Sequence, residues 1–222
     1  GDVDPKKAMS VISRAFSSWQ PGESPIETLK WNEKSLDGRE FVEVKYQAEE
    51  QVMLAYRTVD RNHDDFPAVR LVDMIMDNSV AGLINLNLVE AQVVRAAGAY
   101  PQNMNDYGVQ YLVGVPKDGQ TLDQVEALLK EQIEKVKRGE FEDWILPAVL
   151  NDFKKRRKQD LEENDRRVEL LRDTFLSFRD WNDTAHEISK LEQVTKEDIV
   201  AAANKYFGEN GWLLLKSWVQ FK

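Results

Sequence analysis

Apolar residues recur every three or four positions over long parts of the chain, as they do on the buried face of an amphipathic helix. This spacing predicts helical segments over residues 5–19, 66–89, 122–138, 144–191 and 196–207. We expect the second segment to continue past Asn78 without a break. The third has the clearest ends, because Thr121 and Gln124 form a capping box and Gly139 is a typical helix end.

In other stretches the period is two, which is typical of strands with one buried face. Apolar and charged residues alternate over 41–46, and a second alternating set is Val52, Leu54, Tyr56 and Thr58. A third strand at 107–115 is expected to pair antiparallel with residues 93–100, and a last strand spans 212–221. Strands followed by helices and then a closing strand favour an α+β fold, a mostly antiparallel sheet covered by helices on one face.

The chain has 222 residues, enough to bury a full hydrophobic core. We predict a leading helix and linker at residues 1–39 and a single α+β domain at residues 40–222. Because the sequence does not begin with Met, we expect it to be a fragment whose targeting segment, if it has one, lies upstream.

Composition and charge exclude several classes of function. A formal net charge of −9 disfavours nucleic acid as a partner, since phosphate binding needs surplus lysine and arginine. The basic run at 154–158 is followed by acidic residues and is interpreted as a solvated helix face. No apolar run approaches the roughly 20 residues of a membrane helix, so we expect no membrane partner. The absence of cysteine is compatible with both the periplasm and the cytoplasm, and localisation stays open.

Candidate metal ligands are scarce. The chain has two histidines, His63 and His186, and neither lies in an H-x-x-E-H or H-E-x-x-H motif. We interpret His63-Asp64-Asp65 as a solvated turn before a helix, because three adjacent ligands suit zinc poorly. His186-Glu187 is interpreted as a surface pair. We therefore expect no metal site and no catalytic residue in this chain.

Four groups of residues follow one another in an order that is similar to a known family. They are Gly1-Asp2-Val3-Asp4 before the first helix, Asp65-Phe66-Pro67-Ala68 with its continuation to Leu83, the Thr121 capping box with Lys137 to Phe141, and Thr195 to Ile199 with Asn204 to Phe207. This order resembles the second α/β subdomain in each half of the pitrilysin/insulinase-type zinc metallopeptidases, the inverzincins. The resemblance covers nearly the whole chain.

The resemblance implies the metallohydrolase fold of pitrilysin-type and mitochondrial-processing-type peptidases, in which two halves close around a peptide. Zinc is then expected in the catalytic subdomain of the parent protein, held by H-x-x-E-H and a distant glutamate. This chain would be a non-catalytic substrate-chamber domain, inactive by itself. Its partners would be other subdomains of the same polypeptide or a partner half, together with a peptide substrate.

The family's Arg and Tyr pair, which orients substrate, has no clear counterpart in this chain. Gln110 stands where that Arg is expected, and no Tyr lies between Val115 and Leu122. We take Gln110, Tyr107 and Tyr111 as the substrate-facing candidates. Because Gln carries no charge, the departure favours an alternative: a degenerate structural or protein-interaction module without peptidase activity. A third hypothesis is an unrelated α+β enzyme.

Overall fold

The computed structural model describes residues 2–20, 22, 38–46, 49–78, 80–208 and 212–219. The chain forms two compact units, Gly1–Asn32 and Glu33–Lys222, which are described separately. Most of the predicted linker before Arg39 lies outside the described residues.

The first unit contains helix α1, Pro5–Ala15. The Asp4 side chain caps it by accepting hydrogen bonds from the Lys6 and Lys7 amides, at 2.9 and 3.3 Å. The predicted apolar spacing is present, but no residue of α1 is buried. Just beyond it, the rings of Phe16 and Trp19 meet edge to face with their centroids 4.6 Å apart.

The second unit is built on a five-stranded sheet with the strand order β1-β5-β2-β4-β3. Every pairing is antiparallel except that of β1 with β5, which is parallel. The prediction of a mostly antiparallel sheet is therefore confirmed. The strands are β1 (Arg39–Tyr46), β2 (Gln51–Thr58), β3 (Ala96–Asn103), β4 (Gly108–Val115) and β5 (Trp212–Val219).

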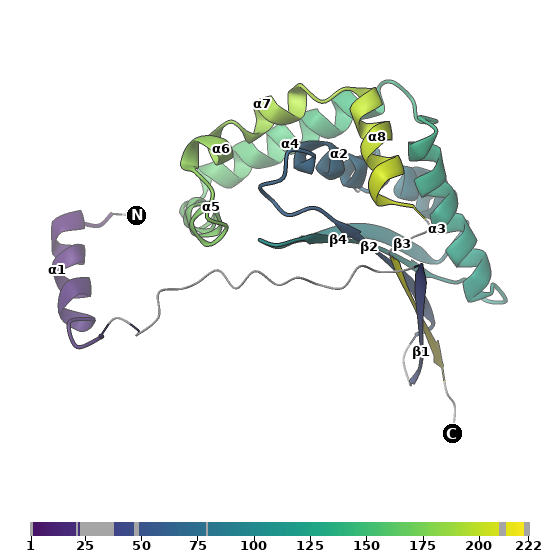
Figure 1. Cartoon of the computed structure of the whole chain (residues 1–222), viewed down its shortest axis with the longest axis horizontal. Coiled ribbons are helices and arrows are strands. Elements are labelled where there is room, and N and C mark those ends of the chain that lie inside the picture. Colours follow the sequence, from purple (N-terminus) through teal and green to yellow (C-terminus); the bar gives the residue numbers. More distant parts are fainter. Residues whose placement is uncertain are drawn as a thin grey trace. The chain divides into compact units, whose positions relative to one another are not determined.

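The helices of this unit lie on one side of the sheet (Figure 1). None of the helices in the described part of the chain is long and apolar enough to cross a lipid bilayer. The helices are α2 (Phe66–Met76), the π-helix η1 (Asn85–Glu90), α3 (Leu122–Lys137), α4 (Ile145–Glu162), α5 (Asn164–Leu176), α6 (Trp181–Ala185), α7 (Glu187–Glu192) and α8 (Lys196–Tyr206).

The expectation of one unbroken helix from residue 66 to 89 is wrong. Helix α2 ends at Met76, and the Asn78 side chain then accepts hydrogen bonds from the Val80 and Ala81 amides, the second at 2.8 Å. Gly82 follows, where an added Cβ would lie 2.6 Å from the Asp77 Cα. The chain therefore folds back on itself too closely to continue as a helix, and the apolar spacing resumes in η1.

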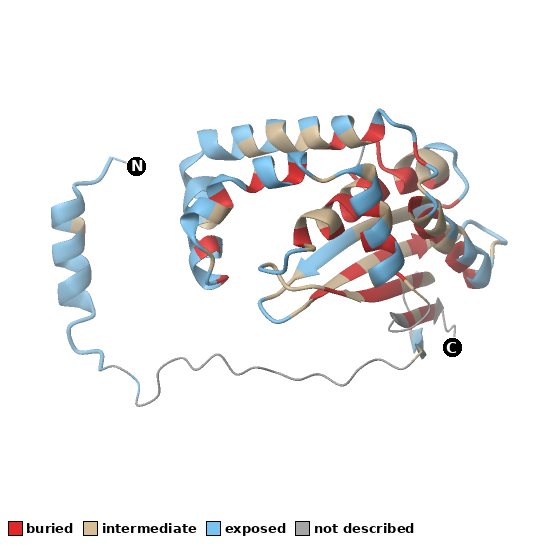
Figure 2. Ribbon diagram, turned by 45° about the horizontal axis from the view of Figure 1, so that its top comes forward, coloured by how far each residue is buried: buried red, intermediate tan, exposed pale blue. Residues whose placement is uncertain are grey.

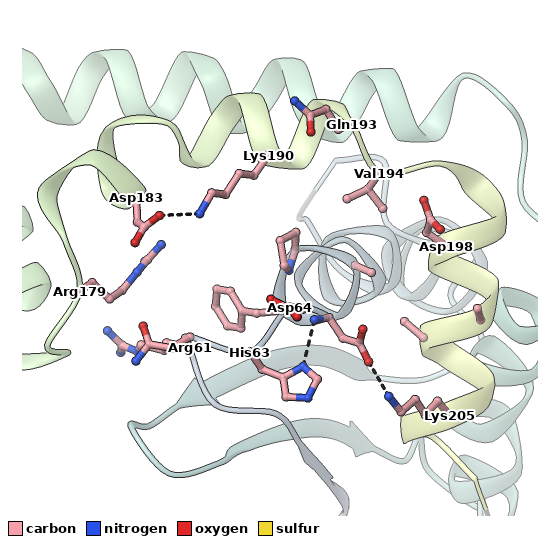
Figure 3. Close-up of a pocket in the computed structure, with 17 residues that line it drawn as sticks. Arg61, His63, Asp64, Arg179, Asp183, Lys190, Gln193, Val194, Asp198 and Lys205 are labelled. Carbon is pink, nitrogen blue, oxygen red and sulfur yellow. Dashed lines mark hydrogen bonds and ion pairs between the residues drawn. The ribbon is translucent and has the colours of Figure 1, made fainter. Parts of the chain in front are cut away.

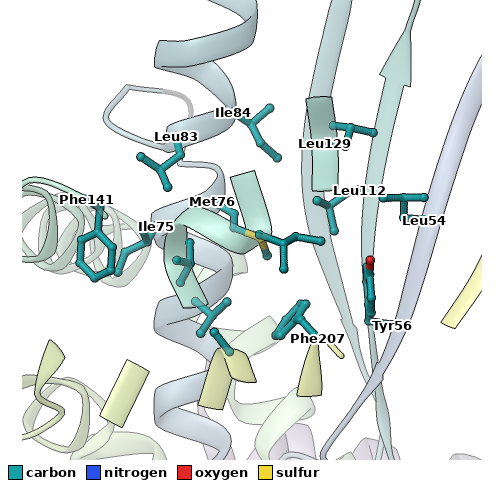
Figure 4. Close-up of a cluster of buried hydrophobic side chains, with 14 of the residues drawn as sticks. Leu54, Tyr56, Ile75, Met76, Leu83, Ile84, Leu112, Leu129, Phe141 and Phe207 are labelled. Atoms are coloured by element: carbon teal, nitrogen blue, oxygen red, sulfur yellow. The ribbon is translucent and has the colours of Figure 1, made fainter. Parts of the chain in front are cut away.

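The core lies between the sheet and the helices, where buried residues of both layers face one another (Figures 2 and 4). Helix α3 contributes a stripe at the predicted positions, each at most 1% exposed: Leu122, Val125, Leu129, Ile133 and Val136. It packs directly over β4, since a Cβ added to Gly114 would lie 2.4 Å from Val125 Cγ1. The capping box at Thr121 is confirmed, with both of its hydrogen bonds present.

Candidate functional site on the uncovered face of the sheet

The two faces of strand β4 differ in what covers them. Its even-numbered residues, among them Gln110 and Leu112, are buried under the helices, and its odd-numbered residues are half-buried on the other face. The covered face contains two glycines, whereas the other carries three valines and Tyr111. The more apolar face of this strand is thus the one that the helices leave open. Such a face is typical of a surface that contacts another protein or a ligand.

Gln110, the first of the predicted substrate-facing residues, lies on the helix side of the sheet. It is 1% exposed, and its Nε2 donates a hydrogen bond of 2.6 Å to Asp73 Oδ1 on α2. Burial raises the pKa of Asp73 to about 7, although the Gln110 hydrogen bond acts in the opposite direction. Because the Gln110 side chain points away from the open face, a ligand on that face cannot contact it.

Tyr111 lies on the open face and forms an aromatic pair with Tyr100. These two residues are partners in the β3–β4 register, and their rings stack with centroids 5.1 Å apart and planes inclined by 24°. The Tyr111 hydroxyl donates a hydrogen bond of 3.2 Å to Gln102 Oε1. Tyr100 was not among the predicted site residues. The expected antiparallel pairing of these strands was the signal that could have placed it opposite Tyr111.

Tyr107, the third predicted residue, lies at the entrance to β4 at one end of the sheet. The Arg57 guanidinium on β2 lies 5.6 Å from the centre of its ring, within the range of a cation–π contact. Arg57 and Val109 are cross-strand partners, which places Arg57 on the open face. The open face therefore presents aromatic rings, apolar side chains and the guanidinium of Arg57.

The two histidines stay apart and are both exposed. His63 Nδ1 accepts a hydrogen bond of 3.0 Å from the Asp65 amide, within the turn that precedes α2. His186 Nδ1 lies 2.7 Å from the Asn182 carbonyl oxygen. In the part of the chain that the structure describes, no three His, Cys, Asp or Glu side chains are grouped to hold a metal ion. These residues do not fit the zinc site of an H-x-x-E-H enzyme.

The interpretation of His186-Glu187 as a surface pair is wrong for Glu187. Its side chain is 8% exposed and forms ion pairs with Arg70 and Arg157, which come from α2 and α4. Both guanidinium groups also lie over the ring of Phe153, at 4.7 and 5.6 Å from its centre. The cluster fastens α7 to the two longer helices. One member of the basic run at 154–158 is therefore part of the helix packing.

Comparison with known proteins identifies the family of this chain. Residues 1–152 match the family model described as the peptidase M16 inactive domain. No curated protein matches the sequence of the chain.

Several solved structures share its fold. A protease from Helicobacter pylori superposes with a TM-score of 0.89 at 19% identity, over 98% of this chain and 54% of that one. A peptidase M16 inactive domain from Pseudomonas fluorescens superposes with a TM-score of 0.80 at 13% identity, over 100% of this chain and 52% of that one. The periplasmic protease PqqL from Escherichia coli superposes with a TM-score of 0.70 at 16% identity, over 99% of this chain and 25% of that one. The chain spans about half the length of the first two proteins, and at these identities the likeness concerns the fold.

Proposed function

The chain belongs to the peptidase M16 family as one of its inactive domains, and from this premise we propose that it forms a non-catalytic wall of the peptide chamber of a longer zinc metallopeptidase. Zinc and the glutamate that activates the water would be contributed by another subdomain of that protein. The substrate would be a peptide that lies along the uncovered face of the sheet.

One observation carries the proposal: strand β4 has its more apolar face on the side that the helices leave open. The aromatic pair Tyr100–Tyr111 lies on that face near the β3 edge of the sheet, and Tyr100 is 48% exposed. Tyrosine rings bind peptide side chains and backbone with little loss of conformational freedom, because a ring has two rotatable bonds and a polar tip. An extended peptide laid across β3 and β4 would therefore cover apolar area that the helices do not.

Partner subdomains follow from the length of the relatives. The H. pylori protease and the P. fluorescens domain are about twice as long as the part that this chain covers. We propose that a second half of comparable size lies opposite the open face and closes the chamber.

The test compares cleavage of a mixed quenched-fluorescent peptide library by the longer polypeptide that contains this chain and by this chain alone, each with and without a zinc chelator. Cleavage that requires the longer polypeptide and disappears with the chelator supports the proposal. No cleavage by either protein would contradict it and favour the alternative, a structural or protein-interaction module of the same fold.

The role of the open face is tested separately by Tyr111→Ala and Tyr100→Ala in the longer polypeptide. We expect each substitution to raise KM several-fold with little change in kcat, because the rings would bind substrate and not the reacting atoms. Phe175→Ala is the matched control, since this exposed aromatic residue lies on α5 in the helical layer. Equal KM values for all three variants would exclude the open face as the substrate surface.

A further inference from the structure

A concave site, separate from the open face of the sheet, lies in the helical layer of the same unit. A partly open cavity of about 660 Å³ is lined by the turn before α2, by the start of α2 and by residues of α6, α7 and α8 (Figure 3). Its volume is in the range of small-molecule sites. Because it lies on the side of the sheet that the helices cover, it is separate from the open face and does not depend on the proposed function.

Two arginines of this cavity form no ion pair with a carboxylate of the described residues, although the charge of Arg179 contributes to the lowered pKa of Asp183. Arg61 donates from Nε to the Asn103 carbonyl oxygen at 2.9 Å and from Nη1 to Ser177 Oγ at 3.0 Å, and both partners are neutral. Arg179 follows Ser177 by two positions, and its guanidinium makes no hydrogen bond or ion pair with any described residue. Figure 3 shows both arginines at the same end of the cavity. Their planar groups thus remain available to an anion.

The acidic residues of the cavity are largely occupied by other groups. Asp183 binds Lys190 at 2.7 Å, and Asp65 binds Lys205 at 2.6 Å. The Asp198 carboxylate accepts from the Thr195 amide at the start of α8. The remaining carboxylate, that of Asp64, is exposed on the turn. None of these carboxylates forms an ion pair with Arg61 or Arg179.

Arg179 lies close enough to Arg70 for their charges to interact. Arg70 and Arg157 share a single carboxylate, that of Glu187. Burial lowers the pKa of Arg70, the Glu187 carboxylate raises it, and the charges of Arg157 and Arg179 lower it, so each of these two arginines repels Arg70. An anion placed between Arg61 and Arg179 would reduce this repulsion. Since the whole chain carries a net charge of −9, such attraction is a local property of this site.

We propose that this cavity, the Arg61–Arg179 pocket, binds a carboxylate ligand. Arginine presents parallel N–H donors that match a carboxylate in a two-point hydrogen-bonded pair. The ligand would place one carboxylate between the two guanidinium groups and extend toward the turn at residues 62–65. A small carboxylic acid and an acidic side chain of a peptide share this chemistry, and the experiment distinguishes them.

The test titrates the whole chain with citrate and with the acetylated, amidated peptide Asp-Glu-Glu-Asp, following the arginine Nε–Hε NMR signals. The peptide Asn-Gln-Gln-Asn, which has the same shape without charge, is the ligand control. We expect saturable binding of citrate or of the acidic peptide with shifts of the Arg61 and Arg179 signals. Saturation by citrate alone assigns a small acid, and saturation by the acidic peptide assigns a peptide segment.

Arg179→Gln is the decisive variant, because the Arg179 side chain has no described partner whose loss would disturb the fold. Removing one charge-assisted pair is expected to weaken binding about tenfold or more. Arg172→Gln is the matched control, since this exposed arginine lies on α5 outside the pocket. No saturable binding up to about 10 mM ligand, or equal affinities in the two variants, would overturn the proposal.

Discussion

Asp73 and Gln110 show how a polar pair is kept inside a hydrophobic layer. Asp73 is 9% exposed and accepts a hydrogen bond from the amide of Gln110, and although this bond and the charge of Arg70 both favour the ionised carboxylate, burial outweighs them. Burial without a full counter-charge disfavours the ionised form, and the pKa of Asp73 rises to about 7. A residue that looks like a ligand-binding amide in the sequence is therefore part of the interior packing.

The raised pKa of Asp73 predicts a pH dependence of stability. Between pH 4 and pH 7 the unfolded chain loses the Asp73 proton while the folded chain keeps it, so this group makes folding less favourable as the pH rises. Asp73→Asn removes the effect. The free energy of unfolding of the variant minus that of the wild type should increase by about 3 kcal/mol over this window.

Urea unfolding of both proteins at pH 4, 5.5, 7 and 8 measures this difference. Asp118→Asn, at an exposed position in the turn before α3, controls for the loss of one negative charge. A difference between Asp73→Asn and the wild type that stays constant with pH would show that burial does not hold the proton on Asp73.

Glu187 provides a second prediction at the scale of single residues. Glu187→Gln leaves two half-buried arginines around a neutral side chain, and breaking a buried ion pair costs about 3 kcal/mol or more. Glu169→Gln is the matched control, because Glu169 pairs with Arg166 on the exposed face of α5, where such pairs contribute about 0.5 kcal/mol. Thermal unfolding measures the loss of stability in each variant. An equal loss in both would contradict the role of Glu187 in holding α7 against α2 and α4.

The contact between α3 and β4 determines how closely the helical layer approaches the sheet. Gly114 has no side chain at the point where Val125 lies closest, and an added Cβ would be 2.4 Å from Val125 Cγ1. Valine has few rotamers in a helix, so it cannot easily move aside. The small residue on β4 is thus required by the packing of α3.

Gly114→Ala is therefore expected to destabilise the fold by about 1–3 kcal/mol, the usual cost of overpacking a core. Gly208→Ala is the control, since an added Cβ there meets no atom within 4 Å. Urea unfolding compares the two. If Gly114→Ala proved as stable as Gly208→Ala, α3 would not pack against β4 at this distance.

The last strand completes the sheet of the second unit. Strand β5 lies between β1 and β2, so residues 39–46 and residues 51–58 both pair with a segment from the far end of the chain. The buried Leu214 joins the main core from this strand. The fold of the unit is therefore incomplete until the last strand is in place.

Truncation after Gly208 removes β5 and should abolish cooperative unfolding, because β1 loses its partner strand and the core loses Leu214. Deletion of residues 2–20 is the comparison, since no residue of α1 is buried and the main core contains only residues from Val52 onward. Circular dichroism during urea unfolding measures both proteins. A cooperative transition in the first protein, or its loss in the second, would contradict this division of the chain.

The sequence by itself determined most of the elements and the family. The capping box at Thr121 and the apolar stripe behind it located α3 to within a residue, and the alternation at 52–58 identified the buried face of β2 correctly. These features are local, because helical and strand periods report which side of an element is apolar. The order of the motifs added the peptidase family, which the match over residues 1–152 confirms.

Only the tertiary structure decided what covers each face. In β4 the apolar residues at 109, 111, 113 and 115 lie on the open side, and Gln110 lies under the helices beside Asp73. The burial of Glu187 also depends on tertiary contacts, since arginines from two other helices form ion pairs with it. A strand period shows that two faces differ but not which one another element will cover. That choice depends on contacts between residues far apart in the sequence.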